Sequence, residues 1–238
     1  MMTEFLLGSL PVQVVRKDIK NVHLSVHPPN GRVRVAAPHH LSLDAVRAFT
    51  IGKLNWIRQQ QQKLQDQDRE QPREYLERES HYVWGCRCLL TIMEHSAPAS
   101  VRLDHSRLIL SVRPATDIER RGEILDAWYR GQLREAAAPV LATWEKRLGV
   151  AAPRLFIQRM KTRWGSCNPR TGAIRLNTDL AKKPRRCLEY IVAHELVHLL
   201  EPTHNVRFVE ILSRHMPDWT HRRQLLNRLP VRHETWTY

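Results

Sequence analysis

The sequence predicts an α+β protein with a β-rich N-terminal region and a largely helical C-terminal part. Short apolar or alternating segments separated by turn residues fill the first 115 residues, and the longest helical pattern of the chain follows them. Hydrophobic residues make up 42% of the chain and charged residues 26%, as is usual for folded globular proteins. We therefore expect two domains, residues 1–115 and 116–238.

The N-terminal region is expected to contain one helix among several strands. Ser42 can cap this helix, which presents Val46 and Ile57 on its apolar face and continues past the glutamines toward Arg73. No internal repeat is evident. The strands expected along the whole chain are residues 12–15, 22–26, 32–36, 82–84, 87–93, 100–103, 107–113, 155–160 and 173–177.

The longest helix is expected to begin after residue 115. Thr116 and Glu119 have the spacing of a capping box, apolar residues then keep the helical period, and Gly149 is placed to end the helix. The strand at residues 173–177 is expected at an exposed sheet edge, where a peptide can add as a further strand. The segment at residues 164–167 before it, Trp-Gly-Ser-Cys, is expected to be a loop.

The charge balance indicates either an anionic partner or a solvated basic surface that only aids solubility. The chain has 38 basic and 24 acidic residues, a net charge of +14, and basic residues gather between Arg154 and Tyr190. Nucleic acid is the polyanion that such a basic surface most commonly binds. No apolar run approaches the roughly 20 residues that span a bilayer, and the first residues lack the basic segment of a signal peptide. We therefore expect a cytoplasmic protein with no membrane association.

A metal site is predicted within the helix expected over residues 185–200. This segment is apolar nearly all round and should be buried, yet His194, Glu195 and His198 lie in its middle. His194 and His198 are about one helical turn apart and can reach one ion, while Glu195 can act as general base on a water that the metal activates. This H-E-x-x-H spacing is typical of zinc peptidases.

A catalytic zinc ion needs a third protein ligand, for which His204 is the leading candidate. Pro202 ends the helix, so the chain can turn back toward the metal while Thr203 caps the next helix. Arg163 and Tyr190 are candidates for stabilising an oxyanion or positioning the substrate. Other divalent transition ions also suit histidine ligands, so these residues do not by themselves select zinc. The rival third ligands are Glu210, Glu201 and Asp218.

Four segments of the last third form a distinctive set: Lys-Thr-Arg-Trp-Gly-Ser-Cys-Asn (161–168), Ile-Arg-Leu-Asn (174–177), Tyr-Ile-Val-Ala-His-Glu-Leu-Val-His (190–198) and His-Asn-Val-Arg-Phe (204–208). Together they resemble the YgjP-like metallopeptidase family, which is related to the SprT-like and other minimal zincins. The resemblance implies a zincin-like metallopeptidase fold with one Zn²⁺, held by His194, His198 and His204. It also implies that Glu195 is the general base for hydrolysis of a protein or peptide substrate. SprT-like relatives act on proteins attached to DNA, which adds to the expectation of nucleic-acid association.

The alternative function is a nucleic-acid or protein adaptor that is stabilised by the metal and has no turnover. Glu195 argues against this alternative, because a purely structural metal site has no need of a carboxylate there. Such a site would also usually close its fourth position with another cysteine or histidine.

Overall fold

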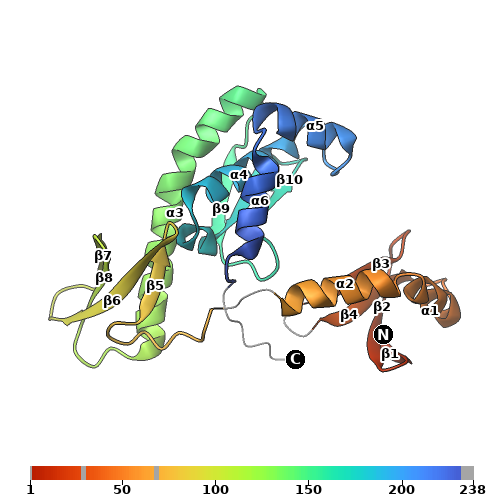
Figure 1. The fold of residues 1–238 in the computed structure, drawn as a ribbon, viewed down its shortest axis with the longest axis horizontal. Coiled ribbons are helices and arrows are strands. Elements are labelled where there is room, and N and C mark those ends of the chain that lie inside the picture. Colours follow the sequence, from red (N-terminus) through yellow and green to blue (C-terminus); the bar gives the residue numbers. More distant parts are fainter. Residues whose placement is uncertain (1, 28–30, 67–69, 232–238) are drawn as a thin grey trace. The chain divides into compact units, whose positions relative to one another are not determined.

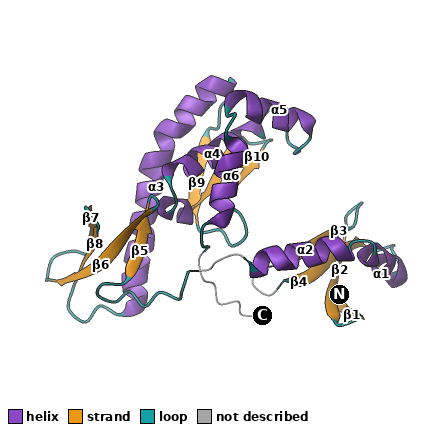
Figure 2. Cartoon of the chain, in the orientation of Figure 1, coloured by secondary structure: helices purple, strands orange, loops and turns teal. Residues whose placement is uncertain are grey.

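The structure, a computed structural model, describes residues 2–27, 31–66 and 70–231 (Figure 1). The chain divides into two compact units, one of Met1–Gln71 with Pro230–Tyr238 and the other of Pro72–Leu229. Both units contain helices and strands, so the fold is α+β (Figure 2). Of the described helices, none has the length and apolarity that a membrane span requires.

The first unit contains a four-stranded sheet and two helices. The strand order is β1-β2-β4-β3, with the central pair parallel and both outer pairs antiparallel. Val14 of β2 and Val35 of β4 share a buried core with Val46 and Ile57 of the helices. The elements are β1 (Met2–Leu7), β2 (Leu10–Lys17), β3 (His23–His27), β4 (Arg32–Pro38), α1 (Leu43–Ile51) and α2 (Leu54–Gln65).

The single helix expected from Ser42 toward Arg73 was wrong. Ser42 does cap α1, since its hydroxyl accepts a hydrogen bond of 3.2 Å from the backbone N–H of Ala45. However, Gly52 ends α1, and Lys53 (φ −110°, ψ 7°) interrupts the helical geometry before α2 begins. Glycine is a weak helix former, which the apolar period alone does not reveal.

The second unit begins with a sheet of the same topology as the first. Its order is β5-β6-β8-β7, again with a parallel central pair and antiparallel outer pairs. The two sheets therefore repeat one strand arrangement, although no repeat was evident in the sequence. The strands are β5 (Ser80–Val83), β6 (Cys86–Glu94), β7 (Ser100–Asp104) and β8 (Arg107–Val112).

Helix α3 (Ile118–Leu148) follows this sheet and packs against it. Its N-cap is Asp117 rather than the expected Thr116, because the Asp117 carboxylate accepts a 2.7 Å hydrogen bond from the N–H of Arg120. Gly149 ends the helix as expected, with a positive φ of 66° that favours glycine. Strands β6 and β8 share one buried core with α3. The domain boundary expected at residue 115 stays a prediction. In the structure, the chain passes from the first compact unit to the second between residues 71 and 72.

A three-stranded sheet lies beside the predicted metal helix. Its order is β10-β11-β9, with β9 (Arg154–Gln158), β10 (Gly165–Asn168) and β11 (Ala173–Asn177). Two expectations were wrong here. The expected loop at residues 164–167 contains most of β10, and β11 is the central strand rather than an edge. Strand β10 is an edge strand. Strand order depends on pairing between segments that are distant in the sequence, so a local sequence pattern does not predict it.

Three helices and a short 3₁₀ helix complete the second unit. Asn205, not Thr203, caps α5, since its side chain accepts a 3.0 Å hydrogen bond from the N–H of Phe208. Glu189 of α4 joins two neighbouring helices, because it accepts from Trp144 of α3 at 3.3 Å and pairs with Arg222 of α6. The elements are η1 (Thr178–Lys182), α4 (Arg185–Val197), α5 (Val206–His215) and α6 (Trp219–Arg228).

Candidate active site

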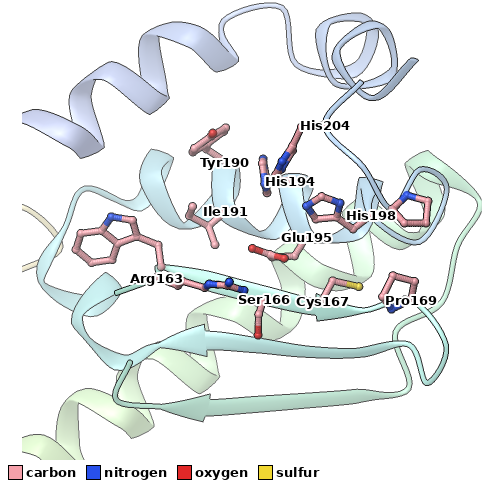
Figure 3. A pocket seen from close by; sticks show the side chains of 13 residues that line it. Arg163, Ser166, Cys167, Pro169, Tyr190, Ile191, His194, Glu195, His198 and His204 are labelled. Atoms are coloured by element: carbon pink, nitrogen blue, oxygen red, sulfur yellow. Dashed lines mark hydrogen bonds between the residues drawn. The ribbon is translucent and has the colours of Figure 1, made fainter. Parts of the chain in front are cut away.

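A cavity of about 560 Å³ lies between the edge strand β10 and helix α4. Figure 3 shows its lining side chains, which come from the segment before β10, from β10 itself, from α4 and from the segment that precedes α5. The lining residues are Arg163, Trp164, Gly165, Ser166, Cys167, Pro169, Tyr190, Ile191, His194, Glu195, His198, Pro202 and His204.

Three imidazole rings converge at this cavity (Figure 3). The ring centroids of His194, His198 and His204 lie 4.6 to 5.0 Å apart. The Nε2 atoms of His194 and His204 are 3.0 Å apart, and one nitrogen from each of the three rings lies within 4.8 Å of the others. The tertiary fold thus brings His204, six residues beyond His198, back to the helical pair.

A buried aromatic ring and a backbone carbonyl hold these imidazoles. Phe208 of α5 is 3% exposed, and its ring centroid lies 4.7 to 5.0 Å from all three histidine rings. The Nδ1 atom of His198 is 3.2 Å from the carbonyl oxygen of Glu201, to which it donates in the Nδ1–H tautomer. This tautomer leaves the Nε2 lone pair of His198 free to bind a metal.

The three histidines fit a divalent transition metal. Ligand nitrogens of one tetrahedral zinc ion lie about 3.3 Å apart, because each Zn–N bond is about 2.0–2.1 Å long. The 3.0 Å separation of the His194 and His204 Nε2 atoms is close to that value. Burial lowers the pKa of His194 to about 3, so its imidazole is neutral near pH 7 as a ligand must be.

The rival third ligands are not brought into this cluster. Glu210 is exposed on α5 and does not line the cavity. Glu201 accepts hydrogen bonds from the N–H and hydroxyl of Thr203, at 3.3 and 3.0 Å. Asp218 accepts from the Arg222 guanidinium at 2.8 Å. His204 is the candidate that the fold places beside His194.

Glu195 is buried against β10, next to the histidines. Its side chain is 5% exposed and is the one carboxylate among the described residues that line the cavity. Burial raises its pKa to about 7, while the nearby charge of Arg163 and a hydrogen bond from the Cys167 backbone N–H oppose the rise. A carboxylate with a pKa near 7 can both accept and release a proton at neutral pH.

Gly165 makes the close approach of β10 to Glu195 possible. A Cβ atom at this position would lie 2.7 Å from Oε1 of Glu195 and 2.8 Å from Cγ2 of Ile191. Any side chain there would displace one of these groups. Burial also raises the pKa of the adjacent Cys167 thiol, to about 11, which keeps it protonated and favours packing over nucleophilic chemistry.

The structure places Arg163 and Tyr190 on the cavity wall, where the sequence suggested roles for both. The backbone of Arg163 is held by Asn177 of β11, whose amide donates to the carbonyl oxygens of Arg163 at 2.9 Å and Met160 at 2.8 Å. Tyr190 is 5% exposed, and its ring meets that of His194 edge-on at 5.8 Å.

Sequence reasoning missed one charged residue that does not line the cavity but influences it electrostatically. Arg223 of α6 acts electrostatically on both Tyr190 and His194. Burial is the main cause of the lowered pKa of His194, and Arg223 lowers it further together with His198 and His204. Arg223 belongs to a helix in which the sequence predicted no site residue, so no local signal connected it with the H-E-x-x-H segment.

Comparison with known proteins assigns the family. The chain is similar to the crystal structure of the metallopeptidase zymogen abylysin of Pyrococcus abyssi, with 20% identity, a TM-score of 0.36, and coverage of 41% of this chain and 99% of that one. For the metallopeptidase zymogen jannalysin of Methanocaldococcus jannaschii, the identity is 19%, the TM-score is 0.33, and the coverage is 40% of this chain and 87% of that one. Comparison with curated protein sequences gives no significant match. A family model for the YgjP-like metallopeptidase domain matches residues 20–229. Because this match spans most of the 238 residues, the chain belongs to the YgjP-like metallopeptidase family and is a hydrolase of that class.

Proposed function

We propose that the protein is a zinc-dependent peptidase of zincin-like architecture, in which His194, His198 and His204 hold one zinc ion and Glu195 is the general base. The observation that carries this proposal is the convergence of three imidazoles beside a buried carboxylate in one cavity. A zinc ion in such a site acidifies water and polarises the scissile carbonyl.

The residues of the chain supply the proton transfer and the orientation. Glu195 accepts a proton from the attacking water at a carboxylate oxygen and delivers it to the leaving amine nitrogen. The Cys167 N–H donates to this carboxylate, and the absence of a side chain at Gly165 leaves the space that the carboxylate occupies. Arg163 and Tyr190, both on the cavity wall, are proposed to stabilise negative charge on the carbonyl oxygen or to position it.

We propose that the substrate binds in extended form along β10 rather than β11. Strand β10 pairs with one neighbour, and its residues Gly165, Ser166 and Cys167 line the cavity. An extended peptide can therefore use the free edge of β10 by strand addition, which places its carbonyl groups beside Glu195.

The basic surface supports a role for nucleic acid as an accessory partner. Lys182 and Lys183 are buried and Arg175 is half-buried, which leaves seven basic residues of this region exposed. Their binding to a polyanion predicts a steep dependence of affinity on salt concentration. The adaptor alternative accounts less well for Glu195, because burying a carboxylate beside the histidines costs stability and a metal site without turnover has no use for it. The exposed residues are Arg154, Arg159, Lys161, Arg163, Arg170, Arg185 and Arg186.

The decisive experiment compares zinc-loaded wild type with zinc-loaded Glu195→Gln in cleavage of an unfolded protein, with and without single-stranded DNA. The exposed Glu210→Gln is the matched control for loss of a carboxylate. We expect cleavage by wild type and Glu210→Gln, no cleavage by Glu195→Gln, and equal zinc content in all three proteins. Cleavage by Glu195→Gln, or no cleavage by any zinc-loaded protein, would contradict the proposed peptidase mechanism. If single-stranded DNA neither binds the protein nor stimulates cleavage, the accessory role of nucleic acid is wrong, while the peptidase proposal is unaffected.

A further inference from the structure

A second cavity, of about 310 Å³, lies between the edge strand β7 and helix α3. It shares no lining residue with the candidate active site, although both cavities belong to the second compact unit. Its walls come from the start of β7, from the residue before this strand and from the N-terminal part of α3. The volume is at the lower end of the range for small-molecule sites, about 300–1,000 Å³, and has room for one large side chain.

The floor of this cavity is apolar, and the charges at its rim offset each other. Val101 of β7 and Ile124 and Trp128 of α3 line the cavity and are half-buried against the hydrophobic core. The two helix residues are four apart and therefore share one face of α3. At the rim, the guanidinium of Arg120 pairs with the carboxylate of Glu123 at 2.6 Å. The cavity therefore suits an uncharged, apolar side chain.

Strand β7 has a free edge beside this cavity. Among the described strands it pairs with β8 alone, and it stands at the end of the sheet opposite β5 (Figure 1). Asp104 and Arg107 flank a two-residue connection and form a hydrogen-bonded pair, after which hydrogen-bonded and non-hydrogen-bonded pairs alternate. The backbone N–H and C=O groups of Val101 and Leu103 therefore point to the free edge. Within the described ranges these groups form no backbone hydrogen bond with another segment, so the edge is a template for a further strand.

A strand that adds to this edge brings its side chains to the cavity. It lies about 4.8 Å from β7, and its successive side chains point alternately to the two faces of the sheet. The side chain of Val101 lines the cavity on the face that α3 covers. Every second side chain of the added strand therefore points toward α3, beside Ile124 and Ala127. In such a groove, backbone hydrogen bonds provide affinity and the pocket for alternate side chains provides specificity.

We propose that the groove between β7 and α3, which we call the β7–α3 groove, binds an extended polypeptide segment that carries a large apolar side chain. The segment adds to the sheet as a fifth strand through the backbone of Val101 and Leu103. Its apolar side chain fills the cavity beside Ile124, Ala127 and Trp128. The occupant is a part of the protein substrate that is distant from the bond that is cleaved.

The assignment to the substrate rests on the proposed peptidase function, because β10 is proposed to bind the same kind of extended chain. Strands β7 and β10 both belong to the second compact unit, so one long unfolded chain can engage both edges. Attachment at the β7–α3 groove raises the effective concentration of that chain at the active site. Unfolded proteins should therefore have a lower KM than short peptides.

The binding test uses a fluorescent ten-residue peptide that alternates Thr and Val and carries one central Phe. It is titrated into zinc-loaded Glu195→Gln, and amide hydrogen exchange is measured on the same complex. We expect exchange at Val101 and Leu103 to slow, because their outward N–H groups become hydrogen-bonded. Replacing the Phe of the peptide with Asp should weaken binding at least about tenfold, because the apolar contact is lost. Unchanged exchange at Val101 and Leu103 in the presence of saturating peptide would overturn the proposal.

N-methylated peptides test the strand addition itself. Two versions of the peptide carry N-methyl groups at every second residue, one version in each of the two frames. A strand pairs with its neighbour through alternate residues, so one version should bind at least about tenfold more weakly, as expected for the loss of two backbone hydrogen bonds. The other version should bind like the unmodified peptide. Equal binding of the two versions would overturn the strand addition.

A matched pair of substitutions on α3 tests the position of the site. Ala127 is exposed and lines the cavity, whereas Ala142 is exposed on the same helix outside it. Ala127→Phe, made in the Glu195→Gln background, fills the cavity and should weaken binding of the peptide at least about tenfold. Ala142→Phe should leave the affinity unchanged, and circular dichroism confirms that both variants are folded. Equal affinities of the two variants would overturn the position of the site.

Cleavage measurements separate this inference from the peptidase function. With Glu195 intact, Ala127→Phe should raise KM for an unfolded protein at least about fivefold, and should leave kcat and the cleavage of short peptides as in Ala142→Phe. If Ala127→Phe changes peptide binding but not KM, the assignment of the occupant to the substrate is wrong. Binding that depends on Ala127, without cleavage by wild type, would support the groove and refute the peptidase. Cleavage by wild type with equal binding by the two phenylalanine variants would refute the groove and uphold the peptidase.

Discussion

The burial of Glu195 predicts a pH-dependent stability difference between the metal-free wild type and metal-free Glu195→Gln. Burial raises the pKa of Glu195 from 4.5 to about 7 in the folded protein. Between these pH values the folded state keeps a proton that the unfolded state has lost, so the stability of wild type falls as pH rises. The glutamine variant lacks this titration, and its stability should not fall for this reason.

The size of the effect follows from the two pKa values. The difference between about 7 and 4.5, at about 1.4 kcal/mol for each pH unit, gives about 3 kcal/mol. The side chain is 5% exposed, so solvent screens the charged form little. Metal-free Glu195→Gln should therefore be more stable than metal-free wild type by about 3 kcal/mol at pH 8.5, and the difference should vanish below pH 4.5, where the carboxyl group is protonated in both states.

Urea denaturation followed by tryptophan fluorescence, in the presence of a chelator, measures this difference. The two proteins share every other titratable group, so the difference between the two unfolding free energies isolates Glu195. Glu210→Gln, at an exposed position on α5, is the control and should match wild type at both pH values. Equal stability of wild type and Glu195→Gln at pH 8.5 would refute the argument that Glu195 is held in a water-poor site.

Three further substitutions test the site. His204→Ala should lower zinc content sharply in metal analysis, whereas Glu210→Ala should not; the reverse result would make Glu210 the third ligand. Gly165→Ala places a methyl group 2.7 Å from Oε1 of Glu195, so it should cost about 1–3 kcal/mol of stability and reduce turnover more than zinc content. Asn177→Ala leaves two partly buried carbonyl groups without their donor, so it should cost about 1 kcal/mol in thermal or urea unfolding and lower kcat/KM by freeing the segment before β10.

Each of these variants has a specific contrary result. Apart from its chain neighbours and the backbone of its own helix, a methyl group added at Gly131 would meet no atom within 4 Å, so Gly131→Ala is the control for Gly165→Ala. Equal turnover of the two alanine variants would show that β10 does not approach Glu195 closely. Unchanged stability of Asn177→Ala would show that its amide does not hold the preceding segment.

Local patterns in the sequence predicted most elements and the helical half of the site. Residues 173–177 form the strand β11 as expected, and Gly149 ends α3 because a positive φ suits glycine. The placement of His194 and His198 on one face follows from helical periodicity alone, since residues four apart lie about one turn from each other. The capping residues of α3 and α5 were misassigned by one or two positions, because neighbouring Thr, Asp and Asn residues have similar capping propensities.

The sequence by itself predicted the histidine pair that is proposed to bind a metal, the carboxylate of Glu195 between the two histidines, and the resemblance to the family, because these depend on short segments with a regular spacing. The tertiary structure alone decided that β10 rather than β11 is the sheet edge and that Gly165 lies against Glu195. It also decided that Arg223, from a helix beyond the motif, acts on His194. The physical reason is that strand order and helix packing join residues through long-range contacts, and local periodicity carries no information about which distant segments will meet.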